Sequence, residues 1–288
     1  MIKMLRLVKY LYIHPLLWLV IGLAIATGHF RELLLLLFII TVHEFGHAAA
    51  AAHFNWRIKR IALLPFGGVA EMDEHGNRPL REELMVVLAG PIQHVWLIGG
   101  AAILHSLTWM SADVFQLFVQ YNLMILIFNL LPIWPLDGGK LIFLFYSSKL
   151  PFPAAHKKTL YLSISSLFVF MIFFLFTGPF NLNIWIVAAF LAFSLYYEWK
   201  QTRYMFMRFL LQRYYGKHTD IRTLKPIIVD EKDKLIDVLD QFQRGCKHPI
   251  VIEQDGAEKG TLDENELLHA YFSEKLVTAK IGDIVYLY

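Results

Sequence analysis

The sequence of 288 residues is poor in charge and almost free of cysteine. Charged residues make up only 18% of it, whereas 57% is hydrophobic and 15% is aromatic, a balance typical of a membrane protein with a modest soluble part. The single cysteine, Cys246, excludes a disulfide within the chain. A net charge of only +3 gives no basis for a direct nucleic-acid partner. The first apolar run lacks a small-residue cleavage site, so we expect it to remain as a membrane span.

Long apolar runs, by contrast, are abundant. Compared with a bilayer core of about 30 Å, they predict six transmembrane helices. The predicted spans are residues 11–27, 33–52, 84–104, 114–131, 160–177 and 184–197. We therefore expect an α-helical polytopic membrane protein, with the membrane domain covering residues 1–199.

The basic residues between these spans are distributed unevenly. One side of the membrane would carry only Arg31. The other side would carry twelve: Lys3, Arg6, Lys9, Arg57, Lys59, Arg60, Arg78, Arg81, Lys140, Lys149, Lys157 and Lys158. Because positively charged connections stay in the cytoplasm, this asymmetry predicts that both termini are cytoplasmic, in agreement with an even number of spans.

The second apolar run contains ionisable residues at a depth where they are costly. His43, Glu44 and His47 form the pattern H-E-x-x-H. On an α-helix, residues four apart share a face, so both imidazoles can bind one metal ion while Glu44 reaches a metal-bound water. The alternative is a pair of hydrogen-bonded core histidines with a partnered glutamate, which a lipid-spanning run disfavours. The pattern predicts an intramembrane zinc hydrolase.

The end of the fourth predicted span offers a third ligand. A catalytic zinc site uses three protein ligands and leaves one position for water. Residues 129–139 read NLLPIWPLDGG, in which two prolines break the helix and two glycines permit tight turns. Broken backbone at membrane depth is tolerated only where protein or a water-filled cavity covers it. Asp137 is thus placed to turn back toward His43 and His47; without the upstream motif, it would be an ordinary Asp-Gly turn.

Together, the H-E-F-G-H motif and the Asn-x-x-Pro…Leu-Asp-Gly pattern resemble the site-two protease family of intramembrane zinc metalloproteases. The resemblance extends over nearly all of residues 1–200. It implies that His43, His47 and Asp137 hold one Zn²⁺ and that Glu44 is the general base. The chemistry agrees, because zinc acidifies water and polarises a carbonyl while a nearby carboxylate carries the proton.

With its C-terminal appendage, the chain is similar to members of this family that act in spore formation. Those proteases cleave the pro-sequence of a membrane-associated sigma-factor precursor. The resemblance implies such a substrate, cut near the cytoplasmic face, and a location in a membrane surrounding the developing spore. The resemblance also implies regulation by inhibitors that are themselves membrane proteins.

A β-prone segment, residues 58–72, separates the second and third spans. Its apolar arms around Gly67 and Gly68 predict a hairpin dipping into the membrane interface. The family resemblance implies a re-entrant strand that pairs with substrate and holds it extended; a plain cytoplasmic hairpin is the alternative. The candidate substrate-binding residues are Phe66, Gly67, Gly68, Asn129 and Pro135. For Asn129, packing between helices is an equal alternative.

The third span contains His94 at a position where the family often has asparagine after Gly-Pro. We expect His94 to be a packed histidine, with a role as partner of a metal ligand as the alternative.

After residue 199 the composition changes. Residues 200–219 combine arginines with apolar residues and predict an interfacial linker helix, or else a plain charged linker. Residues 220–288 predict a small cytoplasmic α/β domain. The expected strands are 226–229 and 249–253, and the expected helices are 235–243 and 264–272.

Residues 248–270 resemble one cystathionine-β-synthase (CBS) repeat. Such repeats usually act in pairs, so a single copy implies a regulatory domain that forms a homo-oligomer. Such repeats often bind an adenine nucleotide through a Thr or Ser and an Asp that contact the ribose. Here Asp263 and Glu266 occupy these two positions, so nucleotide binding is disfavoured. The competing function is a CBS-regulated membrane transporter or channel that uses the buried His and Glu as an ion path; it has no need of Asp137.

Overall fold

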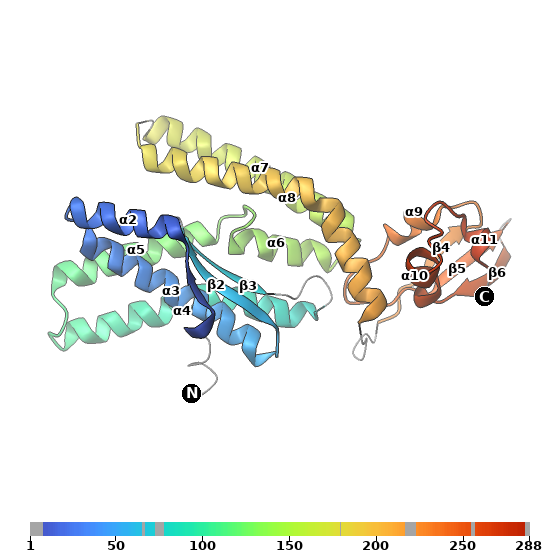
Figure 1. The fold of residues 1–288 in the computed structure, drawn as a ribbon, viewed down its shortest axis with the longest axis horizontal. Helices are drawn as coiled ribbons and strands as arrows, with labels where there is room; N and C mark the ends of the chain where they lie inside the picture. Colours follow the sequence, from blue (N-terminus) through green and yellow to red (C-terminus); the bar gives the residue numbers. More distant parts are fainter. Residues whose placement is uncertain are drawn as a thin grey trace. The chain divides into compact units, whose positions relative to one another are not determined.

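The computed structural model describes residues 8–64, 67–72, 78–178, 180–216, 223–254 and 257–285. The chain forms two compact units (Figure 1). The first consists of residues 1–74, 81–141 and 162–195, and the second of residues 75–80, 142–161 and 196–288.

Five helices are long and apolar enough to cross a membrane. They are α3 (Phe30–His53), α4 (Leu80–Ser106), α5 (Ala112–Asn129), α7 (Phe152–Thr177) and α8 (Leu182–Tyr215). The structure therefore has five candidate membrane spans among its described residues, where the sequence predicted six.

The first predicted span takes a different form. It is divided into strand β1 (Leu11–Ile13) and the apolar helix α2 (Pro15–Ala26). Pro15 favours a helix start at this point because its ring fixes the first helical φ, and His14 caps the helix by accepting a hydrogen bond from the Leu16 backbone N–H at 3.2 Å. A helix of 12 residues rises only about 18 Å, well short of a bilayer core.

A three-stranded sheet lies beside α3 (Figure 1). Its order is β1-β2-β3, in which β1 runs parallel to β2 (Ile58–Leu64) and β2 runs antiparallel to β3 (Gly67–Met72). The hairpin that the sequence predicted is therefore present. Its last described pair joins Leu64 to Gly67, so Gly67 and Gly68 are the first residues of β3 instead of the centre of the turn.

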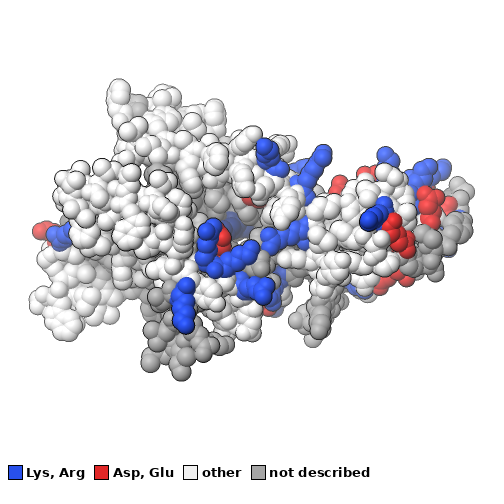
Figure 2. All heavy atoms as spheres, viewed as in Figure 1, with Lys and Arg blue, Asp and Glu red and all other residues white. Residues whose placement is uncertain are grey.

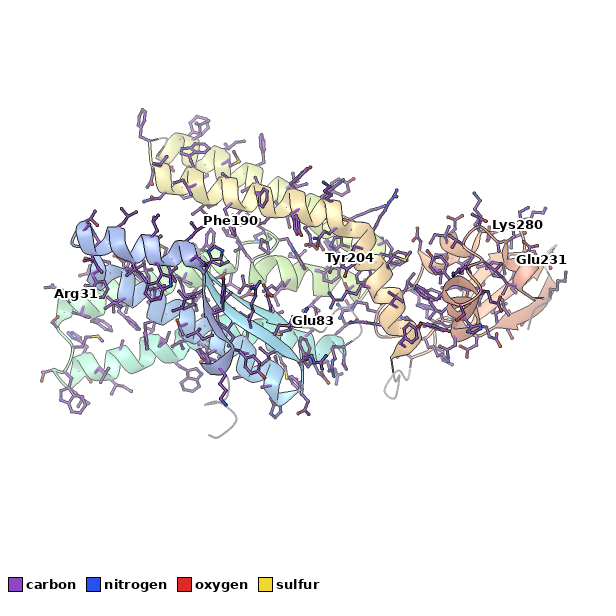
Figure 3. The ribbon with its side chains drawn as sticks, in the orientation of Figure 1. Arg31, Glu83, Phe190, Tyr204, Glu231 and Lys280 are labelled. Atoms are coloured by element: carbon purple, nitrogen blue, oxygen red, sulfur yellow. The ribbon has the colours of Figure 1, made fainter. Side chains whose placement is uncertain are left out.

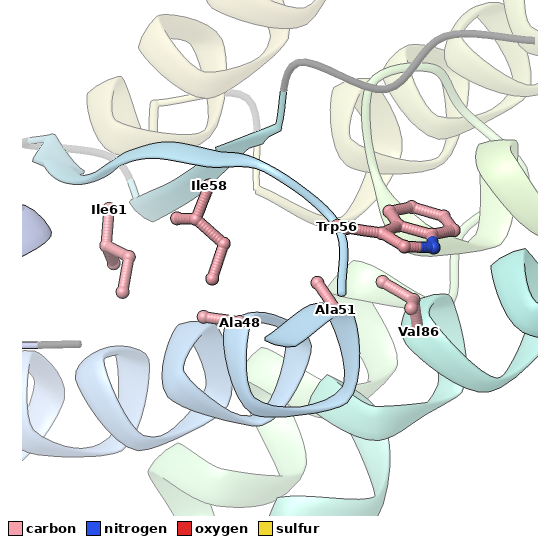
Figure 4. Close-up of a cluster of buried hydrophobic side chains, with 6 residues drawn as sticks. All are labelled: Ala48, Ala51, Trp56, Ile58, Ile61 and Val86. Atoms are coloured by element: carbon pink, nitrogen blue, oxygen red, sulfur yellow. The ribbon is translucent and has the colours of Figure 1, made fainter. Parts of the chain in front are cut away.

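An apolar cluster fixes this sheet on α3 (Figure 4). The side chains all have 9% or less of their surface exposed and come from α3, from β2 with the residues just before it, and from α4. They are Ala48, Ala51, Trp56, Ile58, Ile61 and Val86. The alanines let the strand approach the helix closely. The cluster thereby holds the hairpin against the helix that carries the H-E-x-x-H motif.

Charge in the first unit gathers at the ends of the helices. Figure 2 shows a largely uncharged surface over α2 to α5, with Lys and Arg near the start of β2 and α4. Exposed basic residues there are Arg57, Lys59, Arg60 and Arg81. Arg31 and Glu83 mark opposite ends of this group of helices (Figure 3). Such a band of apolar surface between charged ends is what a bilayer requires.

The second unit contains another three-stranded sheet, in the order β4-β5-β6. Strand β4 is parallel to β5, and β5 is antiparallel to β6. Its elements are β4 (Ile227–Asp230), α9 (Leu235–Leu239), β5 (Ile250–Gln254), β6 (Ala257–Leu262), α10 (Glu264–Phe272) and α11 (Ile281–Val285). The sequence predicted β4, β5, α10 and a longer α9. It missed β6, whose residues AEKGTL have low strand propensity and gain their structure from pairing with β5.

Residues 200–215, predicted to form most of an interfacial linker helix, are helical and continue α8 without a break. Near its end, Arg213 has only 1% of its surface exposed. Its guanidinium forms an ion pair with Glu264 of α10 and donates a hydrogen bond to the Gln243 carbonyl at 2.8 Å. Buried charges persist where they are paired and hydrogen-bonded, so this contact joins the end of α8 to the α/β core.

Candidate metal centre

Three ionisable side chains converge between α3 and the start of α6 (Asp137–Ser147). His43 and His47 lie one turn apart on α3, and Asp137 opens α6. All three are buried. The Asp137 Oδ2 atom lies 3.1 Å from the Nε2 atom of each histidine, and the two Nε2 atoms are themselves 3.1 Å apart. The donor atoms thus form an equilateral triangle.

This triangle has the size that a zinc ion needs. Tetrahedral zinc with bonds of about 2.0–2.1 Å separates its ligand atoms by about 3.3 Å. Two histidines and one carboxylate also form a ligand set that catalytic zinc sites use, with the fourth position left open. Two imidazole nitrogens and a carboxylate oxygen facing one another need a proton or a cation between them, so the chemistry of the donor set fits a metal.

Asp137 reaches the histidines through the predicted break after α5. Helix α5 ends at Asn129, and residues 130–136 form turns that include a cis peptide bond before Pro135. Gly138 and Gly139 then pack directly on these turns. A Cβ atom on Gly138 would lie 2.3 Å from the Leu130 and Leu131 carbonyl oxygens. These glycines are needed for close approach, whereas the sequence predicted that they would form the turns themselves.

Glu44 is buried on α3 and lies against the first residues of β3. A Cβ atom on Gly68 would be 2.3 Å from the Glu44 Cγ atom and 2.8 Å from its Oε1 atom. The absence of a side chain at Gly68 therefore creates the space that Glu44 occupies. The structure brings one predicted substrate-binding residue directly to the predicted general base.

Helix α4 orients His47. The His47 Nδ1 atom lies 2.8 Å from the Val86 carbonyl oxygen. A carbonyl only accepts, so Nδ1 donates, and the lone pair of Nε2 is left for the metal. Gly90 on the same helix makes room for the ring, because a Cβ atom there would lie 2.2 Å from the His47 Nε2 atom.

His43 is oriented by a chain of hydrogen bonds through α4 and α5. The Asn122 Nδ2 group donates to the Phe118 carbonyl, so Asn122 Oδ1 is an acceptor for the His94 Nδ1 group at 3.0 Å. His94 Nε2 must then accept from the His43 Nδ1 group, which is 3.1 Å away. This assignment leaves the lone pair of His43 Nε2 facing the metal position.

Three residues at this site have contacts that the sequence analysis either did not predict or gave only as an alternative. His94 is fully buried, as expected of a packed histidine, and it also contacts a candidate metal ligand, which was the alternative role. Asn122 was missed, although an amide in the middle of an apolar span is a signal of function. Lys140 was counted only for topology, but its Nζ group donates to Asp137 Oδ1 at 3.0 Å.

The other candidate substrate residues have more ordinary surroundings. The Asn129 amide donates to the Ile125 carbonyl of its own helix at 3.0 Å. Pro135 is half-buried in the connection before α6, and Gly67 opens β3. Phe66 lies outside the described residues.

Comparison with known proteins identifies relatives that are zinc metalloproteases. Residues 32–111 and 102–173 match the model of Peptidase family M50. The chain is 48% identical over 283 residues to stage IV sporulation protein FB of Bacillus subtilis, covering 98% of both chains. It is 35% identical over 138 residues to zinc metalloprotease MJ0392 of Methanocaldococcus jannaschii, covering 45% of this chain and 39% of that one. The solved site-2 protease from the same archaeon matches with a TM-score of 0.53 and 28% identity, over 65% of this chain and 89% of that one.

Fold and site together define a membrane-embedded zinc metalloprotease. The chain belongs to peptidase family M50, and its membrane part has the fold of a site-2 protease. The family resemblance found in the sequence is therefore confirmed. The competing hypothesis of a transporter or channel does not agree with this family. The protein is an integral membrane protein with several spans.

Proposed function

We propose that this protein hydrolyses a peptide bond of a membrane-associated sigma-factor precursor near the cytoplasmic face of a membrane. The observation that carries the reaction is the buried triangle of His43, His47 and Asp137 with Glu44 beside it. The substrate class is supported by the similarity to stage IV sporulation protein FB over nearly the whole of both chains.

In this proposal, the Nε2 atoms of His43 and His47 and the Oδ2 atom of Asp137 would hold zinc. Zinc, when bound, polarises the scissile carbonyl and acidifies the attacking water. Glu44 accepts the proton of that water and delivers it to the leaving amine. Val86 and the pair of His94 and Asn122 keep the two imidazoles in the tautomers that the reaction needs.

Strand β3 is proposed to hold the substrate in an extended form. Among the described residues, β2 pairs with one edge of β3 and no strand pairs with the other. A substrate strand added to this edge would have its peptide bonds exposed to hydrolysis, which a helical substrate hides. The position of Gly68 against Glu44 supports this arrangement. Gly67, Phe66, Asn129 and Pro135 remain candidate substrate contacts.

The orientation of the protein follows from its charges. Exposed Arg57, Lys59, Arg60 and Arg81 gather at one end of the apolar helices, and by the positive-inside rule this end faces the cytoplasm. We place both termini there, which counts β1 and the short helix α2 together as a sixth crossing. We also place the protein in a membrane surrounding the developing spore, on the basis of its sporulation relative.

Residues 220–288 are proposed to be a CBS-like regulatory domain that follows the membrane domain (1–199) and a linker (200–219). The domain would pair with a second copy in a homo-oligomer, and membrane-protein inhibitors would act on the same assembly. Adenine nucleotide binding has less support. Asp263 and Glu266 form the capping box of α10, and Asp263 also forms an ion pair with Lys247. Both carboxylates therefore already have partners. Lys247 and Asp263 line the pocket at which a nucleotide would have to bind.

The test of the reaction uses Glu44→Gln in the full chain, purified with its zinc. We expect cleavage of a sigma-factor precursor to stop while zinc content stays at the wild-type level, because the amide removes the proton carrier and spares the ligands. Glu32→Gln on the same helix is the matched control. Cleavage by Glu44→Gln at near the wild-type rate would contradict the proposed mechanism.

A further inference from the structure

The two oxygens of Asp137 have different partners. Oδ2 faces the Nε2 atoms of His43 and His47 at 3.1 Å. Oδ1 instead accepts a hydrogen bond from the Lys140 Nζ group at 3.0 Å, one turn further along α6. Only 3% of the Asp137 side chain is exposed, whereas 41% of the Lys140 side chain is. The carboxylate is thus held between the histidines and a cation that reaches in from a more open side.

Lys140 has no evident role in attracting the metal. An ammonium group carries the same sign of charge as zinc, so its presence beside a ligand weakens metal binding by direct repulsion. A simple helix-stabilising pair is also an incomplete explanation, because Asp137 is buried and both of its oxygens are engaged. What the lysine does provide is a donor for the one carboxylate oxygen that the triangle does not use.

We propose that Lys140 is a positioning residue that limits Asp137 to one bond with the metal. A carboxylate can bind a metal through one oxygen or through both. A catalytic zinc site has to keep a position open for water and the substrate carbonyl, and a second bond from Asp137 would fill it. By holding Oδ1, Lys140 leaves Oδ2 as the only ligand atom of Asp137. This inference rests on the proposed ligand set.

The consequence of losing Lys140 follows from the burial of Asp137. Without the ammonium group, Oδ1 would lose the donor that the structure gives it, and an unsatisfied buried carboxylate oxygen is costly. The nearest cation would then be the metal itself. We therefore expect Lys140→Met to retain metal while changing its coordination.

The experiment compares Lys140→Met, Lys140→Gln and Lys140→Arg, with Lys158→Met as the control because Lys158 is an exposed lysine on another helix, α7. Each full-length protein is purified in detergent, and its zinc content, cobalt(II) absorption spectrum and cleavage rate are measured. For Lys140→Met and Lys140→Gln we expect full metal content, a weaker visible band from five-coordinate cobalt, and a kcat lowered about 10- to 100-fold with KM nearly unchanged. Lys140→Arg, which keeps a charged donor, should retain the wild-type spectrum.

Two results would overturn the proposal. One is a wild-type cobalt spectrum in both Lys140→Met and Lys140→Gln. The other is loss of metal from these variants while Lys158→Met keeps it, because Lys140 would then support binding instead of restricting coordination. The cobalt spectrum needs no substrate, so this outcome is separate from a failure of the proposed function, which the Glu44→Gln cleavage assay reports.

Discussion

At the scale of single residues, the positions of the imidazole protons decide whether the three donor atoms can bind a metal. His43 and His47 each donate an Nδ1 proton to a partner on α4, His43 to His94 and His47 to the Val86 carbonyl, and each thereby directs its Nε2 lone pair at the candidate metal position. The sequence could predict the two histidines because their spacing lies within one helix. For His94 it offered contact with a metal ligand only as an alternative, because that contact depends on how α3, α4 and α5 pack together.

The hydrogen-bond chain ending at Asn122 gives a prediction for metal affinity. Asn122→Leu removes the acceptor that fixes the His94 tautomer, so His43 would no longer be held with Nε2 free. We expect zinc affinity to fall about 10- to 100-fold, measured by competition with a chelator. Gln120→Leu, at an exposed position of the same helix, is the control. Equal affinity in the two variants would remove Asn122 from the support of the metal site.

A second prediction concerns the space around His47. Gly90→Ala places a methyl group 2.2 Å from the His47 Nε2 atom, which is too close, so either the ring or α4 must move. We expect most of the bound zinc to be lost. Gly99→Ala on the same helix meets nothing within 4 Å and should keep its zinc, which separates local displacement from a general effect of alanine in α4. The measurement is the metal content of both purified proteins.

At the scale of elements, the segments that differ from expectation are the ones whose structure depends on distant partners. Residues 11–27 are apolar enough to predict a span, yet Leu11–Ile13 pairs with β2 and shortens the helix that follows to Pro15–Ala26. Pairing with a strand some 50 residues away leaves no periodic signal in the local sequence. The break before Asp137, by contrast, was predictable because proline and glycine act locally.

The contact between β3 and α3 leads to a prediction for catalysis. Gly68→Ala would force the Glu44 side chain away from its position, while the three candidate metal ligands keep theirs. We expect the cleavage rate to fall about 10- to 100-fold with zinc content unchanged, since general-base catalysis contributes on this order or more. Val69→Ala, which shortens a more exposed side chain on the same strand, should have little effect. If both variants cleave equally well, Gly68 does not control the position of Glu44.

At the scale of the whole molecule, the membrane part could be predicted closely from its two motifs, whereas the C-terminal part could be predicted only in outline. No local pattern distinguishes Arg213 from the other arginines of residues 200–219. In the structure it is buried and holds Glu264 of α10, so the last membrane-spanning helix ends inside the core of the α/β part. A buried ion pair depends on two residues 51 positions apart, which only the folded chain brings together.

This ion pair gives the last prediction. Glu264→Gln would leave the Arg213 charge buried without its counter-charge, and the loss of one partner of such a pair costs about 3–5 kcal/mol. Lys247→Met breaks the exposed pair with Asp263 in the same unit and should cost less than about 1 kcal/mol. Hydrogen exchange of the α10 amides in the full chain measures both local stabilities. We expect these amides to exchange much faster only in Glu264→Gln, with zinc content unchanged in both variants because the metal ligands belong to the other unit. Equal protection of α10 in the two variants would show that the buried pair does not stabilise this part of the protein.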